Sequence, residues 1–432
     1  MAERWGFDTL MVRAGYNRAK HNQSVAVPIY QTSSFELGDV ARARRLSSFT
    51  ETGFLYSRVS NPTTDVLEQR ITALDKASAA IAVGSGMTAI TFSLLNTAEG
   101  GGRILTTPNL YGGTVNSFKK IYPKFGVEID VVADADEPQS FENAIRQDNR
   151  WIFVESISNL NAVVADLEAI AAIAHAHDIP LIVDNTFATP YLLNPIRFAA
   201  DVVVYSLTKA LSGHGNIIGV LIVESGKFDW ANGKFPQFAE TDYTLKSSEG
   251  SETSILDAFP QSLFTARIRS ILVNLSPFDA YLTLLGIETL SERVGKQVET
   301  TEALVRYLEQ NEQVAWVKYP SAKSSPYNDL VAKYFSKDSG SVFTFGYKGT
   351  IEHAEKFIDS TKLFIYPLNL GDALSLIINV AATTHRELTE AEQRTADTSP
   401  ETIRLSIGLE HPADLIADFE QPFAKAQCAC CS

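Results

Sequence analysis

The sequence predicts an α/β protein with a mostly parallel central sheet and a smaller C-terminal αβ domain. Strand-length apolar runs alternate with helical patterns between about residues 61 and 225, which is typical of βαβ units. A polar stretch at roughly 225–252 interrupts this alternation, and a new αβ pattern follows from about residue 276. The predicted divisions are an N-terminal arm at 1–60, a large domain at 61–265 and a C-terminal domain at 266–432.

Several apolar runs of the large domain have the length of buried strands. One helix between them is marked by Leu167, Ile170, Ala171 and Ala174, which recur on one helical face, with Asp166 as a plausible N-cap. The predicted strands are AAIAVG (79–84), GRILTT (102–107), IDVVAD (129–134), WIFVES (151–156), PLIVDN (180–185) and DVVVYS (201–206).

The second half of the chain is predicted from three stretches. Residues 225–252 are polar and rich in glycine and serine, which indicates a long surface loop. Residues 276–311 carry a helical pattern too long for one ordinary helix. The C-terminal αβ region then runs through SVFTFGY (341–347), KLFIYPLNLG (362–371) and TIRLSIGLE (402–410).

Composition disfavours several classes of partner. The chain has 37 basic and 51 acidic side chains, for a net charge of −14, which disfavours binding to nucleic acid or to anionic membranes. The N-terminus MAERWGFDTLMVRAG has no uninterrupted apolar core, and no apolar run approaches the roughly 18 residues of a membrane span. We therefore expect a soluble cytoplasmic protein.

All three cysteines, Cys428, Cys430 and Cys431, lie in the C-terminal segment CACCS. The folded body is therefore expected to have no disulfide framework. The segment could bind a soft metal, but a second pair of ligands is not near it in the sequence. A frayed, reduced tail is the simpler interpretation, and no metal site is predicted.

Candidate site residues follow the predicted strands, because ligands in open α/β sheets bind at the carboxyl ends of the strands. A small-residue turn at 84–88 opens a helix, and its free backbone N–H groups suit a phosphate. The other strand ends offer an aromatic ring, carboxylates, hydroxyl groups and an amine. These come from Tyr111, Glu155 with Asn159, Asp184, and the run of Ser206, Thr208 and Lys209.

This combination meets the needs of pyridoxal 5′-phosphate (PLP). PLP requires a lysine for its Schiff base and an acidic partner for its pyridine nitrogen, and Lys209 and Asp184 each follow a predicted strand. The ring of Tyr111 would stack on the pyridine. Each residue alone has a simpler explanation, since Asp184 could cap a helix and Glu155 could pair with an arginine or a helix dipole. The ordered set favours the cofactor.

The chain resembles the Cys/Met-metabolism family of PLP-dependent transsulfuration enzymes. This family has the aspartate-aminotransferase fold, fold type I of the PLP-dependent transferases, which is therefore the expected fold. The resemblance extends from residue 7 to residue 421. Its most specific stretches are VPIYQTSSF (27–35), YSRVSNPTTDVLEQRITALD (56–75), LIVDNTFATPYLLNPIRFAADVVVYSLTK (181–209) and TIRLSIGLEHPADLIADFEQ (402–421).

The resemblance implies a role for each candidate residue. Lys209 corresponds to the Schiff-base lysine, Asp184 to the pyridinium partner and Tyr111 to the stacked ring. Asn159 matches an asparagine near the ring hydroxyl. The implied phosphate contacts are Gly86, Met87, Ser206 and Thr208, together with Tyr56 and Arg58, which in this family reach the cofactor of a neighbouring subunit.

The resemblance also implies how substrate binds and how subunits assemble. Arg404 corresponds to the arginine that grips the substrate α-carboxylate, which suits its planar fork, and Asn369 is expected to contact substrate. The expected partners are small-molecule substrates and other copies of the chain. The implied assembly is a homotetramer built from dimers with shared active sites.

Within the family, the chain is most similar to O-acetylhomoserine sulfhydrylases. The insertion containing GKFDWANGKFPQF (226–238) and the segment LNLGDALSL (368–376) favour that branch. Gly113 stands where many methionine γ-lyases carry a cysteine. Departures from the family pattern are Leu160 in place of a proline, and Asn379-Val380 in place of His-Pro, and they bear on substrate choice.

The expected reaction is a γ-replacement that converts O-acetyl-L-homoserine and sulfide, or a thiol, into L-homocysteine, or methionine, and acetate. The expected catalytic residues are Lys209, Tyr111 and Tyr56. A methionine γ-lyase or a cystathionine γ-synthase or lyase would share the cofactor residues. A non-catalytic PLP-fold binding or regulatory protein is an alternative from another class, which the intact Lys209 and Asp184 disfavour.

Overall fold

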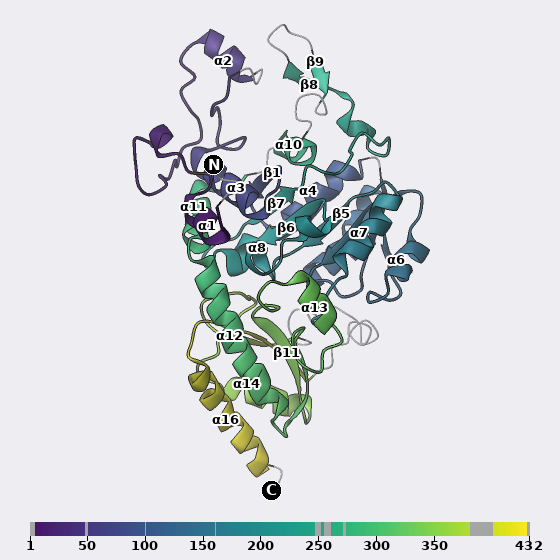
Figure 1. Ribbon diagram of the computed structural model, residues 1–432, viewed down its shortest axis with the longest axis vertical. Helices are drawn as coiled ribbons and strands as arrows, with labels where there is room; N and C mark the ends of the chain where they lie inside the picture. Colours follow the sequence, from purple (N-terminus) through teal and green to yellow (C-terminus); the bar gives the residue numbers. More distant parts are fainter. Residues whose placement is uncertain are drawn as a thin grey trace.

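The structure is a computed structural model, and it describes residues 5–47, 51–99, 101–159, 161–246, 252–254, 261–270, 274–380 and 401–429. The described chain forms a large body around a seven-stranded sheet and a smaller body around a four-stranded sheet. The two bodies lie one above the other along the long axis of the molecule (Figure 1). This arrangement confirms the predicted fold class.

The seven-stranded sheet has the order β1-β7-β6-β5-β4-β2-β3. Neighbours from β6 to β3 pair in parallel, whereas β7 lies antiparallel between β1 and β6. Helices cover both faces, so the strands are apolar throughout rather than alternating. The strands are β1 (Ala79–Val83), β2 (Gly102–Thr106), β3 (Val127–Val131), β4 (Asn149–Glu155), β5 (Leu181–Asp184), β6 (Val202–Ser206) and β7 (Val220–Glu224).

Two hydrophobic clusters fill the space between this sheet and its helices. The first is formed with α1 (Phe7–Arg13), α3 (Pro62–Asp75), α7 (Leu167–Ala176) and α11 (Pro277–Ile287). The second is formed with α4 (Gly86–Thr97), α5 (Gly112–Lys120) and α10 (Leu263–Ser270). As predicted, Asp166 caps α7, because its carboxylate accepts a hydrogen bond from Ala169 N at 3.4 Å. Shorter elements of this body are α6 (Pro138–Ala144), α8 (Thr189–Leu192), η3 (Tyr122–Phe125) and η4 (Pro195–Phe198).

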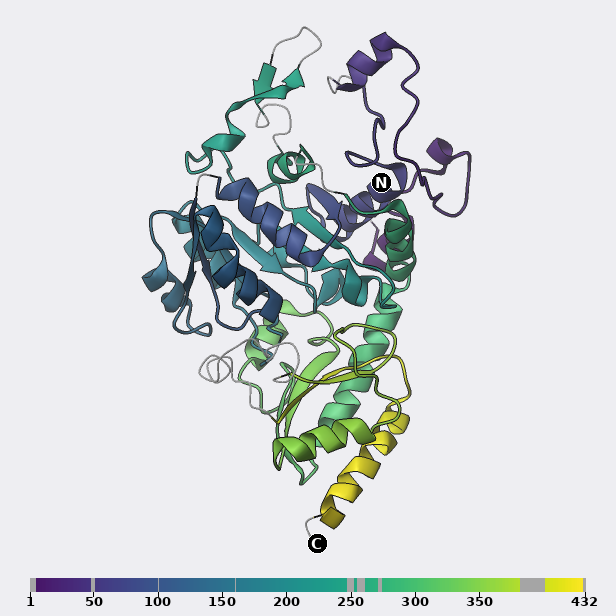
Figure 2. The same cartoon turned by 180° about the vertical axis from the view of Figure 1, so that it is seen from behind.

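The N-terminal arm has one part on the body and one part away from it. Leu10 and Met11 of α1 are buried against the large body. The arm then passes through η2 (Arg18–His21) to α2 (Val40–Ser47). Both ribbon views place α2 beyond the main body (Figures 1 and 2).

The predicted surface loop at 225–252 is wrong for its first half. Trp230, Phe235 and Phe238 are buried there, and Trp230 stacks on Phe264 with ring centroids 5.1 Å apart. The aromatic side chains carry no helical or strand period, because they pack from irregular backbone around η6 (Pro236–Phe238). The rest of the insertion contributes an antiparallel pair, β8 (Thr241–Lys246) and β9 (Glu252–Ser254).

The long helical pattern divides into two helices, as its length predicted. α11 ends at Ile287 and α12 (Leu290–Glu309) continues into the small body. Residues of α12 up to Val298 belong to the core of the large body, and those from Leu304 belong to the core of the small body. We propose on this packing that the domain boundary lies within α12 rather than near residue 265.

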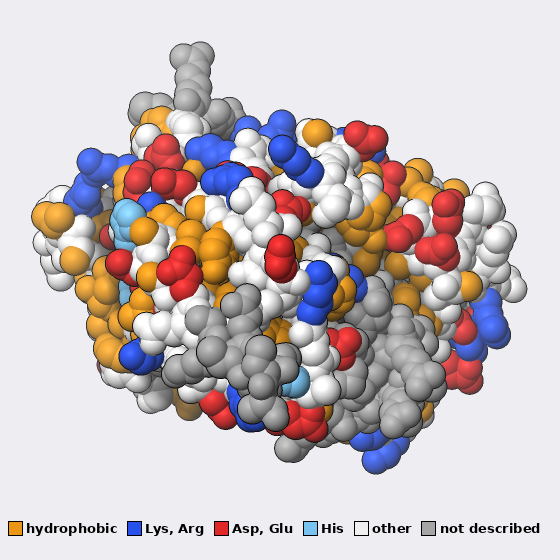
Figure 3. Space-filling view, turned by 90° about the horizontal axis from the view of Figure 1, so that it is seen from below, with side chains coloured by type: hydrophobic (Ala, Val, Ile, Leu, Met, Phe, Trp, Pro, Cys, Tyr) orange, Lys and Arg blue, Asp and Glu red, His pale blue; other side chains and the backbone are white. Residues whose placement is uncertain are grey.

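The small body has an antiparallel sheet of order β10-β11-β13-β12. Its strands are β10 (Val314–Lys318), β11 (Val342–Tyr347), β12 (Leu376–Asn379) and β13 (Thr402–Ser406), with α13 (Asn328–Tyr334), α14 (Ile351–Ser360) and α16 (Pro412–Ala429) around them. Acidic, basic and hydrophobic side chains are interspersed on the face at this end of the molecule (Figure 3). Cys428 belongs to α16, whereas Cys430 and Cys431 lie outside the described residues.

Candidate active site

A cavity of about 350 Å³ lies at the carboxyl ends of β4, β5 and β6, where the sequence places its candidate residues. Side chains from both bodies line it. Those with a predicted role are Gly86, Met87, Tyr111, Asn159, Asp184, Ser206, Thr208, Lys209, Asn369 and Arg404. Lining residues to which sequence reasoning gave no role include Thr114, Thr186, Phe187, Leu368 and Leu370.

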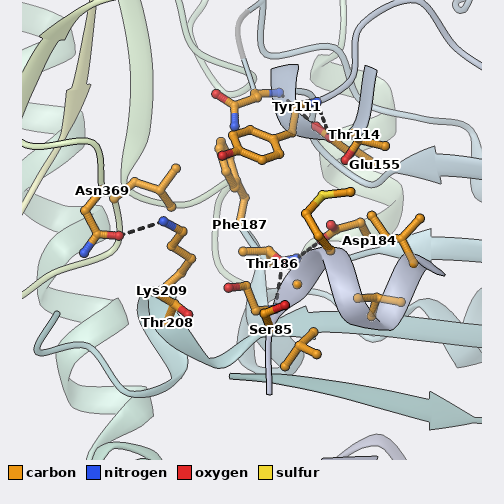
Figure 4. A pocket seen from close by; sticks show the side chains of 18 of the residues that line it. Ser85, Tyr111, Thr114, Glu155, Asp184, Thr186, Phe187, Thr208, Lys209 and Asn369 are labelled. Atoms are coloured by element: carbon orange, nitrogen blue, oxygen red, sulfur yellow. Dashed lines mark hydrogen bonds between the residues drawn. The ribbon is translucent and has the colours of Figure 1, made fainter. Parts of the chain in front are cut away.

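Lys209 lies on a distorted helical turn, Leu207–Leu211, directly after β6. Its backbone has φ −98° and ψ −140°, which departs from helical values and turns the side chain into the cavity. The amine donates a hydrogen bond to Asn369 Oδ1 at 2.7 Å (Figure 4). Burial, helped by the charge of Arg404, lowers the pKa of Lys209 to about 8.

A buried arginine supports this turn from behind. The Arg293 guanidinium donates to the carbonyl oxygens of Ala210, Leu211 and Gly286 at 2.7 to 3.3 Å. Burial lowers its pKa to about 10, so it remains charged at neutral pH. Because Ala210 and Leu211 directly follow Lys209 and Gly286 lies in α11, Arg293 of α12 joins the turn to both helices.

Asp184 ends β5 with its carboxylate facing the same cavity. Its Oδ1 accepts a hydrogen bond from Thr186 N at 2.9 Å, and Thr186 Oγ1 accepts one from Ser206 N at 2.9 Å. Burial raises the pKa of Asp184 above its ordinary value. Sequence reasoning missed Thr186, whose position two residues after a strand-end aspartate was the available signal.

The start of α4 forms one wall of the cavity. Ser85 caps the helix by accepting a hydrogen bond from Thr88 N at 3.2 Å. A Cβ on Gly86 would meet no atom within 4 Å, so open space adjoins this helix N-terminus. The hydroxyl groups of Ser206 and Thr208 line the same cavity. Helix-terminal N–H groups with nearby hydroxyl groups are donors that suit a phosphate.

Tyr111 precedes α5, and its ring lies in the cavity (Figure 4). Its backbone N–H donates to Glu155 Oε1 at 2.6 Å. A Cβ built on Gly113 would lie 2.6 Å from Tyr111 Cε1, so this ring position depends on the glycine. Burial, together with the charge of Asp184, raises the pKa of Glu155 to about 8.

Arg404 reaches the cavity from β13 of the small body. Its Nη1 donates to Asn159 Oδ1 at 2.6 Å, and its Nη2 donates to the backbone oxygen of Asn369 at 3.3 Å. Burial lowers its pKa to about 10, which leaves it charged at neutral pH. Asn159, expected near a ring hydroxyl, therefore also orients the arginine.

Tyr56 and Arg58 are not among the residues that line this cavity. The guanidinium carbon of Arg58 lies 5.1 Å from the centre of the Tyr56 ring, and Tyr56 is 42 % exposed. Among the departures, Asn379 and Val380 are buried at the end of β12, and Leu160 lies outside the described residues.

Within the described ranges, no group of three or more His, Cys, Asp or Glu side chains could hold a metal ion. A search of the same residues found no helix that is long and apolar enough to cross a membrane. The groups that line the cavity fit PLP instead. Lys209 supplies an amine, Asp184 a carboxylate, Tyr111 an aromatic face, and the N-terminus of α4 a site for phosphate.

Comparisons with known proteins agree with this fit. The family model described as Cys/Met metabolism PLP-dependent enzyme matches residues 8–424. A homocysteine synthase of Schizosaccharomyces pombe is 41 % identical, covering 96 % of this chain and 97 % of its own. O-acetyl-L-homoserine sulfhydrylase 1 of Thermus thermophilus is 40 % identical, and the match covers 97 % of this chain and 100 % of that protein.

A solved structure of similar fold comes from Campylobacter jejuni. It is of a protein assigned as an O-acetylhomoserine (thiol)-lyase, and it carries a pyridoxyl-lysine phosphate. Its TM-score to this chain is 0.91, with 36 % identity over 97 % of this chain and 99 % of that one.

Proposed function

Because the chain belongs to the Cys/Met-metabolism family of PLP-dependent enzymes, we propose that it catalyses a γ-replacement on O-acetyl-L-homoserine. Sulfide, or a thiol, takes the place of acetate at Cγ, which gives L-homocysteine or methionine. The observation that carries the proposal is the single cavity that joins Lys209, Asp184 and Tyr111 to Arg404. Support comes from full-length relatives named homocysteine synthase and O-acetyl-L-homoserine sulfhydrylase.

The residues that would hold PLP come from neighbouring strand ends. Lys209 would hold it covalently, Asp184 would face its ring nitrogen, and the ring of Tyr111 would stack on it. The phosphate would bind at Gly86 and Met87, with Ser206 and Thr208. When bound, PLP supplies an electron sink for the carbanion at the α-carbon of the substrate.

Lys209 has the properties of the group that moves protons. With a pKa of about 8, about a tenth of the amine is neutral at pH 7, against about one part in 3,000 for an ordinary lysine. Its hydrogen bond to Asn369 gives the released amine a defined position. The amine can therefore take the α-proton and later return it. Tyr111, and Tyr56 of a neighbouring subunit, are the candidates to assist.

Arg404 orients the substrate for this proton transfer. Its guanidinium remains charged and is already held by Asn159 and Asn369. A planar fork of this kind binds a carboxylate through two parallel hydrogen bonds. With the α-carboxylate fixed, loss of a proton from Cβ expels acetate from Cγ. Hydrosulfide then adds at Cγ, so one anion enters for each that leaves.

The lyase alternatives differ in what completes the reaction. Without an outside nucleophile at Cγ, the part of the substrate that remains after acetate has left is hydrolysed by water to 2-oxobutyrate and ammonia. The deciding experiment supplies purified protein with O-acetylhomoserine, with and without sulfide, and measures homocysteine against 2-oxobutyrate. We expect mostly homocysteine at millimolar sulfide, slower cleavage of methionine, and no turnover by Lys209→Ala. Methionine cleavage without sulfide incorporation would overturn the proposal in favour of a γ-lyase.

We propose further that the enzyme is a cytoplasmic homotetramer in which Tyr56 and Arg58 complete the site of a neighbouring subunit. The exposure of Tyr56 and the absence of both residues from the described cavity of their own chain support this proposal. Mixing Arg58→Ala with Lys209→Ala, each inactive alone, should restore activity in hybrids that contain one intact site. No recovery after verified subunit exchange would count against shared sites.

A further inference from the structure

Glu155 is a carboxyl group in the cavity to which the proposed reaction gives no role. It is the last residue of β4 and pairs in register with Asp184, the last residue of β5. Both side chains line the same cavity, since parallel strands end at the same edge of the sheet. The sequence suggested an arginine partner or a helix dipole for Glu155. Its hydrogen bonds instead come from two backbone N–H groups.

The two oxygens of Glu155 bind two different segments. Oε1 accepts from Tyr111 N at 2.6 Å, and Oε2 accepts from Asn159 N at 3.2 Å. The first segment carries the aromatic ring. The second carries the amide that binds Arg404 at 2.6 Å. One carboxyl group therefore links the backbone of the segment that carries the ring to the backbone of the segment that binds the arginine.

We propose that Glu155 is a positioning residue that fixes the spacing between the Tyr111 ring and the Asn159–Arg404 pair. It is well placed to do so, because it projects from a strand of the central sheet rather than from a loop. The N-cap residue of α5, Tyr111, makes no side-chain cap of its own.

This inference rests on the proposed function only for the identity of the ligands that the Tyr111 segment and the Asn159–Arg404 pair would bind. The Tyr111 end would bind the ring of PLP, and the Arg404 end would bind the carboxylate of the substrate. A substitution that weakens the hydrogen bonds of Glu155 should therefore disturb both at once, through the two segments that the carboxyl group holds. A residue that only stabilises the fold would lower the unfolding temperature without changing either affinity.

The test replaces Glu155 by Gln, which keeps the shape of the side chain. An amide has one oxygen, so one of the two backbone N–H groups would face an NH₂ donor. An N–H group left without an acceptor in a buried site is costly, more so than the loss of an average hydrogen bond. We expect PLP to bind about tenfold more weakly in equilibrium dialysis, and KM for O-acetylhomoserine to rise about tenfold. Glu155→Asp, which keeps both carboxyl oxygens but is shorter, should show both effects in milder form.

Glu224 provides a matched control at the opposite edge of the sheet. It is a buried glutamate at the end of β7, and its oxygens accept from Phe264 N at 3.1 Å and Thr265 N at 2.9 Å. Glu224→Gln should reduce stability and leave PLP affinity and KM unchanged. A second check adds Glu155→Gln to an enzyme that already carries Arg404→Lys. In this background Glu155→Gln should raise KM much less than it does alone, because both changes act through the contact between Asn159 and Arg404.

The proposal is overturned if Glu155→Gln leaves PLP affinity and KM within twofold of the unmodified enzyme. It is also overturned if Glu224→Gln changes them equally, since the effect would then be one of stability. The PLP measurement needs no substrate. If the unmodified protein bound PLP but made no homocysteine, the proposed function would fail, and the PLP measurement would still decide the role of Glu155.

Discussion

The amine of Lys209 should capture PLP with a pH dependence unlike that of an ordinary lysine. Burial disfavours the charged ammonium and the positive charge of Arg404 disfavours it further, so the pKa falls to about 8. About 1 % of the amine is then neutral at pH 6, about half at pH 8 and about nine tenths at pH 9. The second-order rate of PLP capture by the cofactor-free enzyme follows this neutral fraction.

The diagnostic interval lies between pH 8 and pH 9. There the rate should rise less than about twofold, whereas a lysine with an unshifted pKa would give a rise of about tenfold. Capture can be followed by stopped-flow absorbance. The reaction of PLP with a blocked free lysine, measured in the same buffers, corrects for the titration of PLP itself.

Two variants separate the causes of this shift. Arg404→Gln removes the neighbouring cation, so the plateau should begin at higher pH. Glu155→Gln removes the other group in the cavity with a pKa near 8 and should leave the onset of the plateau unchanged. A rate that keeps rising tenfold per pH unit up to pH 9 in the unmodified enzyme would show that the pKa of Lys209 is not lowered.

Two further predictions concern Gly113 and Arg293. A side chain at residue 113 must displace the Tyr111 ring, since its Cβ would lie 2.6 Å from Tyr111 Cε1. Gly113→Cys should therefore weaken PLP binding and raise the fraction of product that is 2-oxobutyrate. An unchanged ratio of 2-oxobutyrate to homocysteine would contradict this prediction. Arg293→Gln removes a buried cation that binds carbonyl oxygens of Ala210, Leu211 and Gly286. This substitution should lower the free energy of unfolding by about 3 kcal/mol, as measured by urea denaturation, and Arg293→Lys should recover part of that loss. An unchanged denaturation midpoint would show that these hydrogen bonds contribute no net stability.

The parallel strands could be predicted because their signal is local. β1, β2, β4, β5 and β6 match continuous apolar runs, which is how a strand covered on both faces reads. β3 lies at the edge of the sheet and begins two residues before the prediction, directly after Gly126 in a left-handed conformation (φ 76°). β7 is not among the strands named from the sequence, and its antiparallel direction could not be predicted, because pairing direction depends on neighbours distant in sequence.

Much of the candidate site could also be predicted, since strand-end residues of a parallel sheet meet at one edge. Contacts made by residues of the small body could not be predicted in this way. Nothing local indicates that Asn369 accepts from Lys209, or that Arg404 donates to Asn159. These residues were identified through family resemblance, which gives a role for a position but no hydrogen-bond partner.

Sequence reasoning missed Thr186 and Arg293, and it placed Glu155 in the site without identifying its hydrogen-bond partners. The three residues share a physical feature. The side chains of Glu155, Thr186 and Arg293 act largely through backbone N–H or carbonyl groups of other segments. Every residue except proline carries both groups, so the sequence does not indicate which backbone group such a side chain binds. A side chain that reads a cofactor must match it chemically, whereas one that binds backbone needs only the right place in the fold. Positioning residues of this kind therefore become visible only once the chain is folded.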